Sequence, residues 1–128
     1  LIWLAPGGGR ESGETEIECL LREIKEETGH VVDKVFGPVW FRQKVFKLHN
    51  QTFDQHETFY WVPTSKFEPN AANNPALEER DIFRGFRWWT LDEIREAKNE
   101  IFVPLTFADH LADLFSNHLR NAPVAVGV

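Results

Sequence analysis

The spacing of apolar residues changes along the chain, and each spacing predicts a different element. The apolar run "LIWLA" opens the chain and is followed by Pro and Gly, which predicts the end of a buried strand running into a turn. From Thr15 to Thr28 the apolar residues recur at the spacing of a helix that packs one side on a core. The residues of this stripe are Ile17, Leu20, Leu21, Ile24 and Thr28.

Signals at both ends support this first helix. Thr15 and Glu18 match the S/T-x-x-E capping box, in which two side chains satisfy backbone N–H groups at the start of a helix. Gly29 lies where a glycine commonly ends a helix, because it adopts a left-handed backbone conformation at little cost. We therefore expect one helix over residues 15–28.

The stretch from Val31 to Val62 is rich in strand signals. "VWFRQKVFKL" is β-branched and aromatic and partly alternates, "HNQT" predicts a turn, and "ETFYWVP" predicts a second strand. Farther along, "GFRWWT" predicts another short strand. Between "ETFYWVP" and "GFRWWT", the stretch "EPNAANNPALEERD" is rich in Pro and Asn and predicts a long loop with a helical turn near its end.

Two more helices are expected in the last third of the chain. Thr90 and Glu93 repeat the capping box and start a short helix that extends to about Asn99. A last amphipathic helix is expected from Thr106 to about Arg120. Its core-facing residues are Leu111, Leu114, Phe115 and Leu119.

The order strand, helix, strands, helices favours an α/β fold in which helices cover both sides of a sheet. The length of 128 residues suits one domain, 1–128, with residues 121–128 as a C-terminal tail without clear structure. The net charge of −6 argues against general electrostatic binding to nucleic acid or to an anionic membrane. The single Cys19 excludes an intrachain disulfide and suits a cytoplasmic location. No apolar run approaches the length of a membrane span.

Carboxylates gather on one side of the first helix. Glu26 and Glu27 follow Glu23 by three and four residues, so all three side chains can converge, and Glu16 lies earlier on the same line. Like charges at this spacing destabilise a helix, whereas hard divalent cations take such oxygen ligands. A solvated acidic face is the alternative. Arg22 lies just beyond the group and can pair with Glu26.

The residues around these carboxylates form a known pattern. Gly8 is followed after five residues by Glu14, and after seven more by the string "REIKEETG" from Arg22 to Gly29. This resembles the Nudix box, G-x5-E-x7-R-E-U-x-E-E-x-G-U, where U is a bulky apolar residue. "WLAPGGG" before the box, and "QHETFYWV", "FRWWTLDEI" and "FVPLTFADHLADLF" after it, resemble the layout of small bacterial Nudix hydrolases.

One position departs from the box. His30 stands where the pattern has an apolar residue. Either Val31 or the apolar body of the imidazole can serve this position, so the departure concerns packing at the end of the helix more than chemistry. The family resemblance therefore stands on every other specified position.

The resemblance implies a metal-dependent hydrolase with a particular fold. Nudix hydrolases cleave a pyrophosphate linkage in a nucleoside diphosphate joined to another group, with Mg²⁺ or Mn²⁺ as cofactor. Their fold is an α/β/α sandwich with a mixed central sheet and a loop-helix-loop box. By resemblance the metal ligands are Glu23, Glu26 and Glu27, Arg22 holds a box carboxylate in place, and Gly8 and Gly9 let the backbone approach the substrate.

The family often adds a carboxylate from outside the box, as a ligand or as the general base. The candidates are Glu57, Glu78, Glu79 and Glu100. Glu57 is the most suggestive, because a charge is less expected on a predicted strand than in a loop; for each candidate the alternative is a solvated surface residue. Aromatic residues could form a platform for a base, although core packing is favoured for Trp40, Phe41, Tyr60, Trp61, Trp88 and Trp89.

The expected function is hydrolysis of a nucleotide by water attacking phosphorus. Substrates left open are (d)NTPs, nucleotide sugars and dinucleoside polyphosphates. The alternative is a Nudix-like module that binds or senses a nucleotide without hydrolysing it, although such modules typically lack box carboxylates. A homodimer is a family-level expectation. Nudix domains usually carry a strand well before the box, so we also expect an upstream strand in the native protein.

Overall fold

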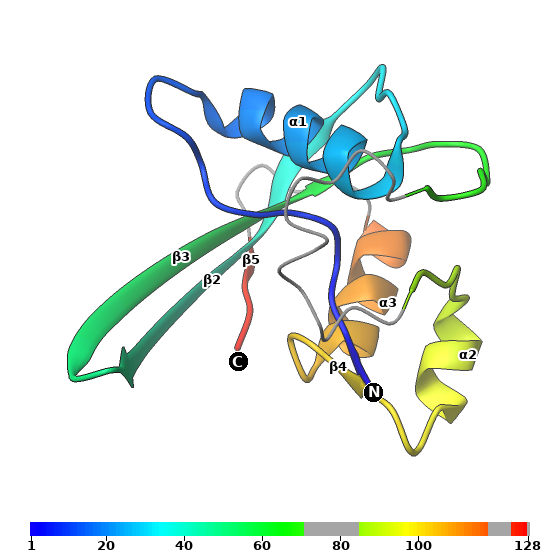
Figure 1. Cartoon of the computed structure of the whole chain (residues 1–128). Helices are drawn as coiled ribbons and strands as arrows, with labels where there is room; N and C mark the ends of the chain where they lie inside the picture. Colours follow the sequence, from blue (N-terminus) through cyan, green and yellow to red (C-terminus); the bar gives the residue numbers. More distant parts are fainter. Residues whose placement is uncertain (71–84, 118–123, 128) are drawn as a thin grey trace. The chain divides into compact units, whose positions relative to one another are not determined.

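A computed structural model describes residues 1–70, 85–117 and 124–127 of the chain (Figure 1). The elements of the described chain are, in order, β1 (Ile2–Trp3), α1 (Glu16–Thr28), β2 (Phe36–Leu48), β3 (Gln51–Trp61), α2 (Leu91–Glu96), β4 (Ile101–Phe102), α3 (Phe107–Asn117) and β5 (Val124–Ala125). The chain divides into two compact units. The sheet unit comprises Leu1–Leu4, Phe36–Trp61 and Trp89–Val128, and the helix unit comprises Ala5–Val35 and Val62–Trp88.

The longest elements form an antiparallel hairpin in the sheet unit. β2 and β3 run side by side and are joined by the two-residue turn His49–Asn50 (Figure 1). Both turn residues have positive φ, 51° and 62°, as in the type I′ turns that match the twist of a hairpin. The two predicted strands and their turn are confirmed, and each strand starts earlier than predicted.

A third strand makes this sheet mixed. β5 pairs in parallel with β2, Trp40 opposite Val124, and the strand order is β3-β2-β5. The combination of antiparallel and parallel pairing confirms an α/β fold with a mixed sheet. The prediction of a tail without structure is wrong at Val124–Ala125, because a two-residue strand is determined by its distant partner and leaves no periodic signal.

A smaller parallel sheet joins β1 to β4, with Ile2 opposite Ile101 and Trp3 opposite Phe102. The strand predicted in "LIWLA" is confirmed. The prediction that this strand is buried is wrong, because Ile2 is 65% exposed and both Leu1 and Leu4 are exposed. Trp3 is the anchoring residue, since its ring packs edge-on against Trp89 with centroids 5.1 Å apart.

The core of the sheet unit lies around Trp40. Val39, Trp40 and Val126 are buried, and the rings of Phe59 and Phe107 lie 5.5 and 5.4 Å from Trp40. α3 contributes to this core through Phe107, Leu111 and Leu114. Phe115 was also predicted to face the core, and this is wrong: the residue is exposed, because the side of α3 that packs on the core carries Phe107, Leu111 and Leu114. The predicted end of the helix, with Leu119, lies outside the described residues.

Residues 85–90 correct one predicted strand. "GFRWWT" forms no strand in the described chain. Instead, the Trp88 indole donates a hydrogen bond to the Phe67 carbonyl at 2.9 Å within the helix unit. Trp89 packs its ring against Phe102 in the sheet unit, with centroids 4.9 Å apart. The aromatic run is thus explained by separate ring contacts.

α2 follows directly and carries the predicted cap. The Thr90 hydroxyl accepts from the Glu93 N–H at 3.1 Å, and the Glu93 carboxylate accepts from the Thr90 N–H at 2.8 Å. This confirms the second capping box. The helix ends at Glu96, three residues before the predicted end near Asn99. Across the parts of the chain described here, none of the helices combines the length and hydropathy that a membrane crossing requires.

Candidate active site

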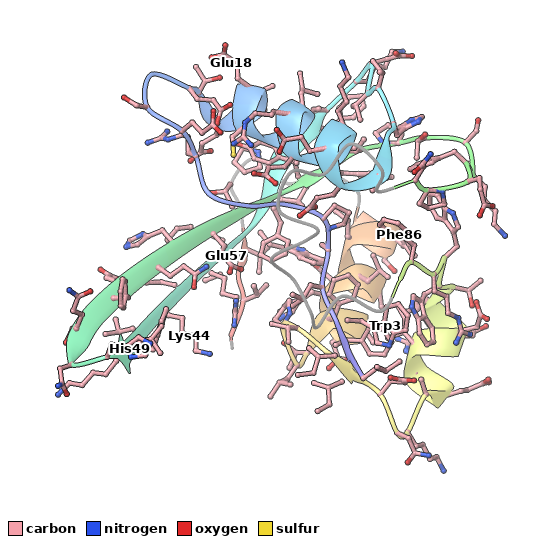
Figure 2. The ribbon with its side chains drawn as sticks, viewed as in Figure 1. Trp3, Glu18, Lys44, His49, Glu57 and Phe86 are labelled. Atoms are coloured by element: carbon pink, nitrogen blue, oxygen red, sulfur yellow. The ribbon has the colours of Figure 1, made fainter. Side chains whose placement is uncertain are left out.

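α1 begins and ends as its sequence predicts. The Thr15 hydroxyl accepts from the Glu18 N–H at 3.1 Å and the Glu18 carboxylate accepts from the Thr15 N–H at 3.0 Å; Figure 2 labels Glu18 at this end of the helix. At the other end Gly29 has a φ of 76° and donates its N–H to the Lys25 carbonyl at 2.9 Å. The helix is therefore capped at both ends, and the side of α1 on which each carboxylate lies follows from its position in the helical repeat.

The buried side of α1 is narrower than predicted. Cys19, Ile24 and Thr28 are buried, whereas Ile17 and Leu21 of the expected stripe are exposed. Burial raises the pKa of the Cys19 thiol above its ordinary value, and this cysteine fills space in the helix unit as a small apolar residue would.

Arg22 is the centre of the box. Its guanidinium binds Glu14 with two hydrogen bonds, from Nε at 2.7 Å and from Nη2 at 2.9 Å. Nη1 donates to Glu23 at 2.8 Å and to Glu26 at 3.2 Å, which confirms the pairing predicted for Arg22 and Glu26. The hydrogen bonds from Arg22 lower the pKa of Glu14 to about 2, and they raise the pKa of Arg22 above its ordinary value. One cation thus holds three box carboxylates.

The glycine-rich segment lies against the same side chains. The Gly8 carbonyl accepts from the Cys19 thiol at 3.6 Å, and the Gly9 carbonyl accepts from Arg22 Nη2 at 3.0 Å. A Cβ atom on Gly8 would lie 2.6 Å from the Glu23 carboxyl carbon, whereas one on Gly9 would meet nothing within 4 Å. A Cβ atom at position 8 would therefore displace the Glu23 carboxylate, whereas one at position 9 would displace nothing.

The three carboxylates predicted to converge are divided between two partners. Glu23 and Glu26 meet on Arg22, and the Glu27 carboxylate accepts from the Gly7 N–H at 2.8 Å. Within residues 1–70, 85–117 and 124–127, no three His, Cys, Asp or Glu side chains are gathered as a metal site would require. The donor chemistry nevertheless fits a hard divalent cation, since these are carboxylate oxygens on adjacent turns of one helix.

His30 packs the end of the helix. Its imidazole stacks on the Phe67 ring, with centroids 4.0 Å apart and planes 6° from parallel, and its Nε2 lies 2.9 Å from the Thr64 hydroxyl. Val31, the other candidate for this position, is 68% exposed. The imidazole body therefore replaces the apolar residue of the box, and the departure concerns packing, as the sequence indicated.

The carboxylates outside the box have different environments. The Glu57 carboxylate on β3, labelled in Figure 2, accepts from Arg42 Nη1 at 2.9 Å and from Gln55 Nε2 at 3.1 Å. Glu100 accepts from the Trp3 indole at 3.0 Å, which ties it to β1. Glu78 and Glu79 lie outside the described residues. Glu57 is therefore the described candidate whose partners are themselves polar side chains.

Sequence reasoning missed Arg42. This residue is 7% exposed, pairs with Glu57 across the two strands, and stands in the middle of the aromatic stretch "VWFRQKVF". A cation inside a strand with aromatic neighbours was the available signal, because such a side chain is rarely buried without a partner.

The fold and these contacts define an α/β protein in which a glycine loop and a capped helix present carboxylates around one arginine. The family model of the NUDIX domain matches residues 2–109, so the chain belongs to the Nudix family. Members of this family generally hydrolyse nucleoside diphosphate derivatives and generally use divalent metals such as Mg²⁺. No curated protein matches the chain significantly.

Proposed function

We propose that the protein is an active Nudix hydrolase, which cleaves a pyrophosphate linkage in a nucleoside diphosphate derivative, (d)NTPs included. The observation that carries the proposal is the Arg22 network, because it joins Glu14, Glu23 and Glu26 in the register of the box. A module that only bound nucleotides would have no need to keep all of these carboxylates in place.

Glu23, Glu26 and Glu27 are the proposed metal ligands. A Mg²⁺ or Mn²⁺ ion held by these side chains would supply charge neutralisation at the pyrophosphate and a more nucleophilic water. Arg22 orients Glu23 and Glu26, and the Gly7 N–H orients Glu27. Gly8 leaves room for the Glu23 carboxylate. These contacts preorganise the donors, which lowers the cost of arranging them when substrate arrives.

The proposed mechanism also uses a proton acceptor from outside the box. Glu57 is our choice among the described residues, because its carboxylate lies on a strand, where a charged side chain is less expected than in a loop. Arg42 and Gln55 hold the two Glu57 oxygens, and this fixes the orientation of the carboxylate on its strand. An acceptor of this kind must reach the attacking water directly or through one further water.

The partner is a nucleotide, bound by an acidic protein through metal ions, while nucleic acid and membrane are not expected partners. A cytoplasmic location is supported by a single, buried cysteine. The homodimer stays a family-level prediction.

The test is a panel of nucleotides incubated with Mg²⁺ or Mn²⁺, with released phosphate and pyrophosphate measured. We expect Glu27→Gln to lower kcat by more than about a hundredfold, since even the partners of metal ligands cost about 10- to 100-fold when removed. Glu96→Gln, at the exposed end of α2, is the matched control and is expected to keep full activity. Equal background release from the wild type and both variants would overturn the enzyme assignment, and full activity in Glu27→Gln would overturn the role of that residue.

A further inference from the structure

One face of the β2–β3 hairpin carries rows of polar side chains between rows of aromatic ones. Side chains alternate between the two faces of a strand, so every second residue of β2 shares a face with its partner on β3. The rows of this face, which we call the ladder face, are Trp40 with Phe59, Arg42 with Glu57, Lys44 with Gln55, and Phe46 with Phe53. Figure 2 labels Glu57 and Lys44 along the hairpin. Polar rows therefore lie between two aromatic rows.

Arg42 has hydrogen-bonding capacity that the described protein does not use. Its Nη1 donates to Glu57, whereas its buried Nε has no hydrogen-bond partner among the described residues. A buried N–H group without an acceptor costs on the order of 1–3 kcal/mol, more when the group is charged, so native proteins rarely leave one. The guanidinium thus lacks one acceptor.

The charge of the polar rows is opposite to that of the chain. Arg42 and Lys44 face the single carboxylate Glu57, so two positive charges stand against one negative charge on a protein of net charge −6. Lys44 is exposed and lies one row beyond Arg42. An anion is the ligand that this excess favours, and a phosphate oxygen is an acceptor of the kind that guanidinium groups bind well.

The outer aromatic row adds a second kind of contact. Phe46 and Phe53 stack with centroids 5.4 Å apart, and Phe53 is 40% exposed. Rows on one face are separated by two strand residues, so the Lys44 row lies about 7 Å from this exposed ring and the Arg42 row about 14 Å from it, distances that a nucleotide can span. A phosphate joined to a flat ring system fits both features.

We propose that the ladder face binds a nucleoside phosphate. Arg42 and Lys44 donate to its phosphate group, Glu57 keeps the Arg42 guanidinium in position, and the base stacks on Phe53. The site rests on the proposed function in taking a nucleotide as its ligand, and it shares Glu57 with the proposed mechanism, while its contacts involve none of the box carboxylates.

The experiment is equilibrium binding by calorimetry with EDTA present, so that binding is measured without metal-dependent turnover. The ligands are ADP, adenosine and inorganic phosphate. We expect ADP to bind more tightly than adenosine or phosphate. Lys44→Gln is expected to weaken ADP binding about fivefold, the upper range for an exposed ion pair. Phe53→Ala is expected to weaken ADP binding about tenfold while phosphate binding is unchanged.

Lys47→Gln is the matched control, because it removes the same charge from the same exposed strand but on the opposite face. If Lys44→Gln and Lys47→Gln weaken ADP binding equally, the effect comes from the overall charge of the protein and not from a contact on the ladder face, which would overturn the proposal. ADP that binds no more tightly than phosphate would also overturn it. If the protein binds ADP with these effects but releases no product when metal is present, the ladder-face site stands and only the hydrolase assignment is overturned.

Discussion

At the scale of single residues, Arg22 determines which carboxylates of the box are satisfied. The guanidinium holds Glu14, Glu23 and Glu26, and only Glu14 receives two hydrogen bonds from it. Glu14 therefore has a structural part in the box, whereas Glu23 and Glu26 each keep a share of their oxygens for other ligands. This difference is consistent with the proposed roles of Glu23 and Glu26 as metal ligands, because Glu14 is the carboxylate that Arg22 binds at both oxygens.

The lowered pKa of Glu14 predicts that the stability of the protein depends on pH. Its pKa falls from 4.5 to about 2 because of the hydrogen bonds from Arg22, so folding favours the ionised form. The resulting stability is fully present above about pH 4.5 and is lost as the pH falls toward 2. Thermal unfolding followed from pH 6 to pH 2 should show a steeper loss of Tm for the wild type than for Glu14→Gln. Identical profiles would contradict this assignment, and Glu96→Gln should behave as the wild type.

A second prediction compares the alanine substitutions Gly8→Ala and Gly9→Ala, each of which adds one methyl group at adjacent positions. Gly8→Ala would put a Cβ 2.6 Å from the Glu23 carboxyl carbon and displace that side chain, whereas Gly9→Ala would add a methyl group to open space. We expect Gly8→Ala to weaken Mn²⁺ binding about tenfold or more, and Gly9→Ala to leave it within about twofold. Electron paramagnetic resonance of free Mn²⁺ measures both. Equal affinities in the two variants would contradict the assignment of Glu23 as a ligand that Gly8 helps to position.

At the scale of elements, the C-terminal end of α1 is held by the segment that follows the hairpin. His30 stacks on Phe67, and the Asn70 N–H donates to the Thr28 carbonyl at 2.8 Å. Because the helix carries the box carboxylates, this attachment also sets how firmly Glu26 and Glu27 are positioned. The residue that departs from the family pattern is therefore part of the support of the site.

We predict that His30→Ala lowers the free energy of unfolding by about 1 kcal/mol, the value of a stacked ring pair. His30→Leu, which restores an apolar residue, should recover most of this loss. Val31→Ala is the control: it is the neighbouring exposed residue and should change stability by less than about 0.5 kcal/mol. Urea denaturation of the three variants measures these values. A loss for Val31→Ala as large as for His30→Ala would contradict the assigned packing.

The elements show which parts of the fold a sequence can predict. α1, its caps and the β2–β3 hairpin were predicted, because their signals are local and repeated over many residues. β5 and the chain at 85–90 were missed, since a two-residue strand and isolated ring contacts depend on partners far along the chain. The site follows the same division: the box was predicted by its spacing, whereas Arg42 required the cross-strand partner Glu57 to be seen.

At the scale of the whole molecule, chemistry is distributed over two units. The helix unit contains the box, and the sheet unit contains the ladder face. The protein is acidic overall, yet each unit places an arginine beside carboxylates, Arg22 in one and Arg42 in the other. An acidic protein that handles phosphates needs local cations of this kind, in addition to any metal, because its general field repels the substrate.

The length of the hairpin has a consequence for solubility. β5 pairs with β2 only at Trp40 and Phe41, so in the described chain the rest of that edge has no neighbouring strand. An uncovered strand edge is a template for another chain, and proteins commonly protect such edges with lysine. Lys44 and Lys47 stand on this part of β2, one on each face. Lys44, which we assign to a ligand, is thus also placed where a lysine commonly protects an uncovered strand edge, and replacing it with an apolar residue would remove that protection.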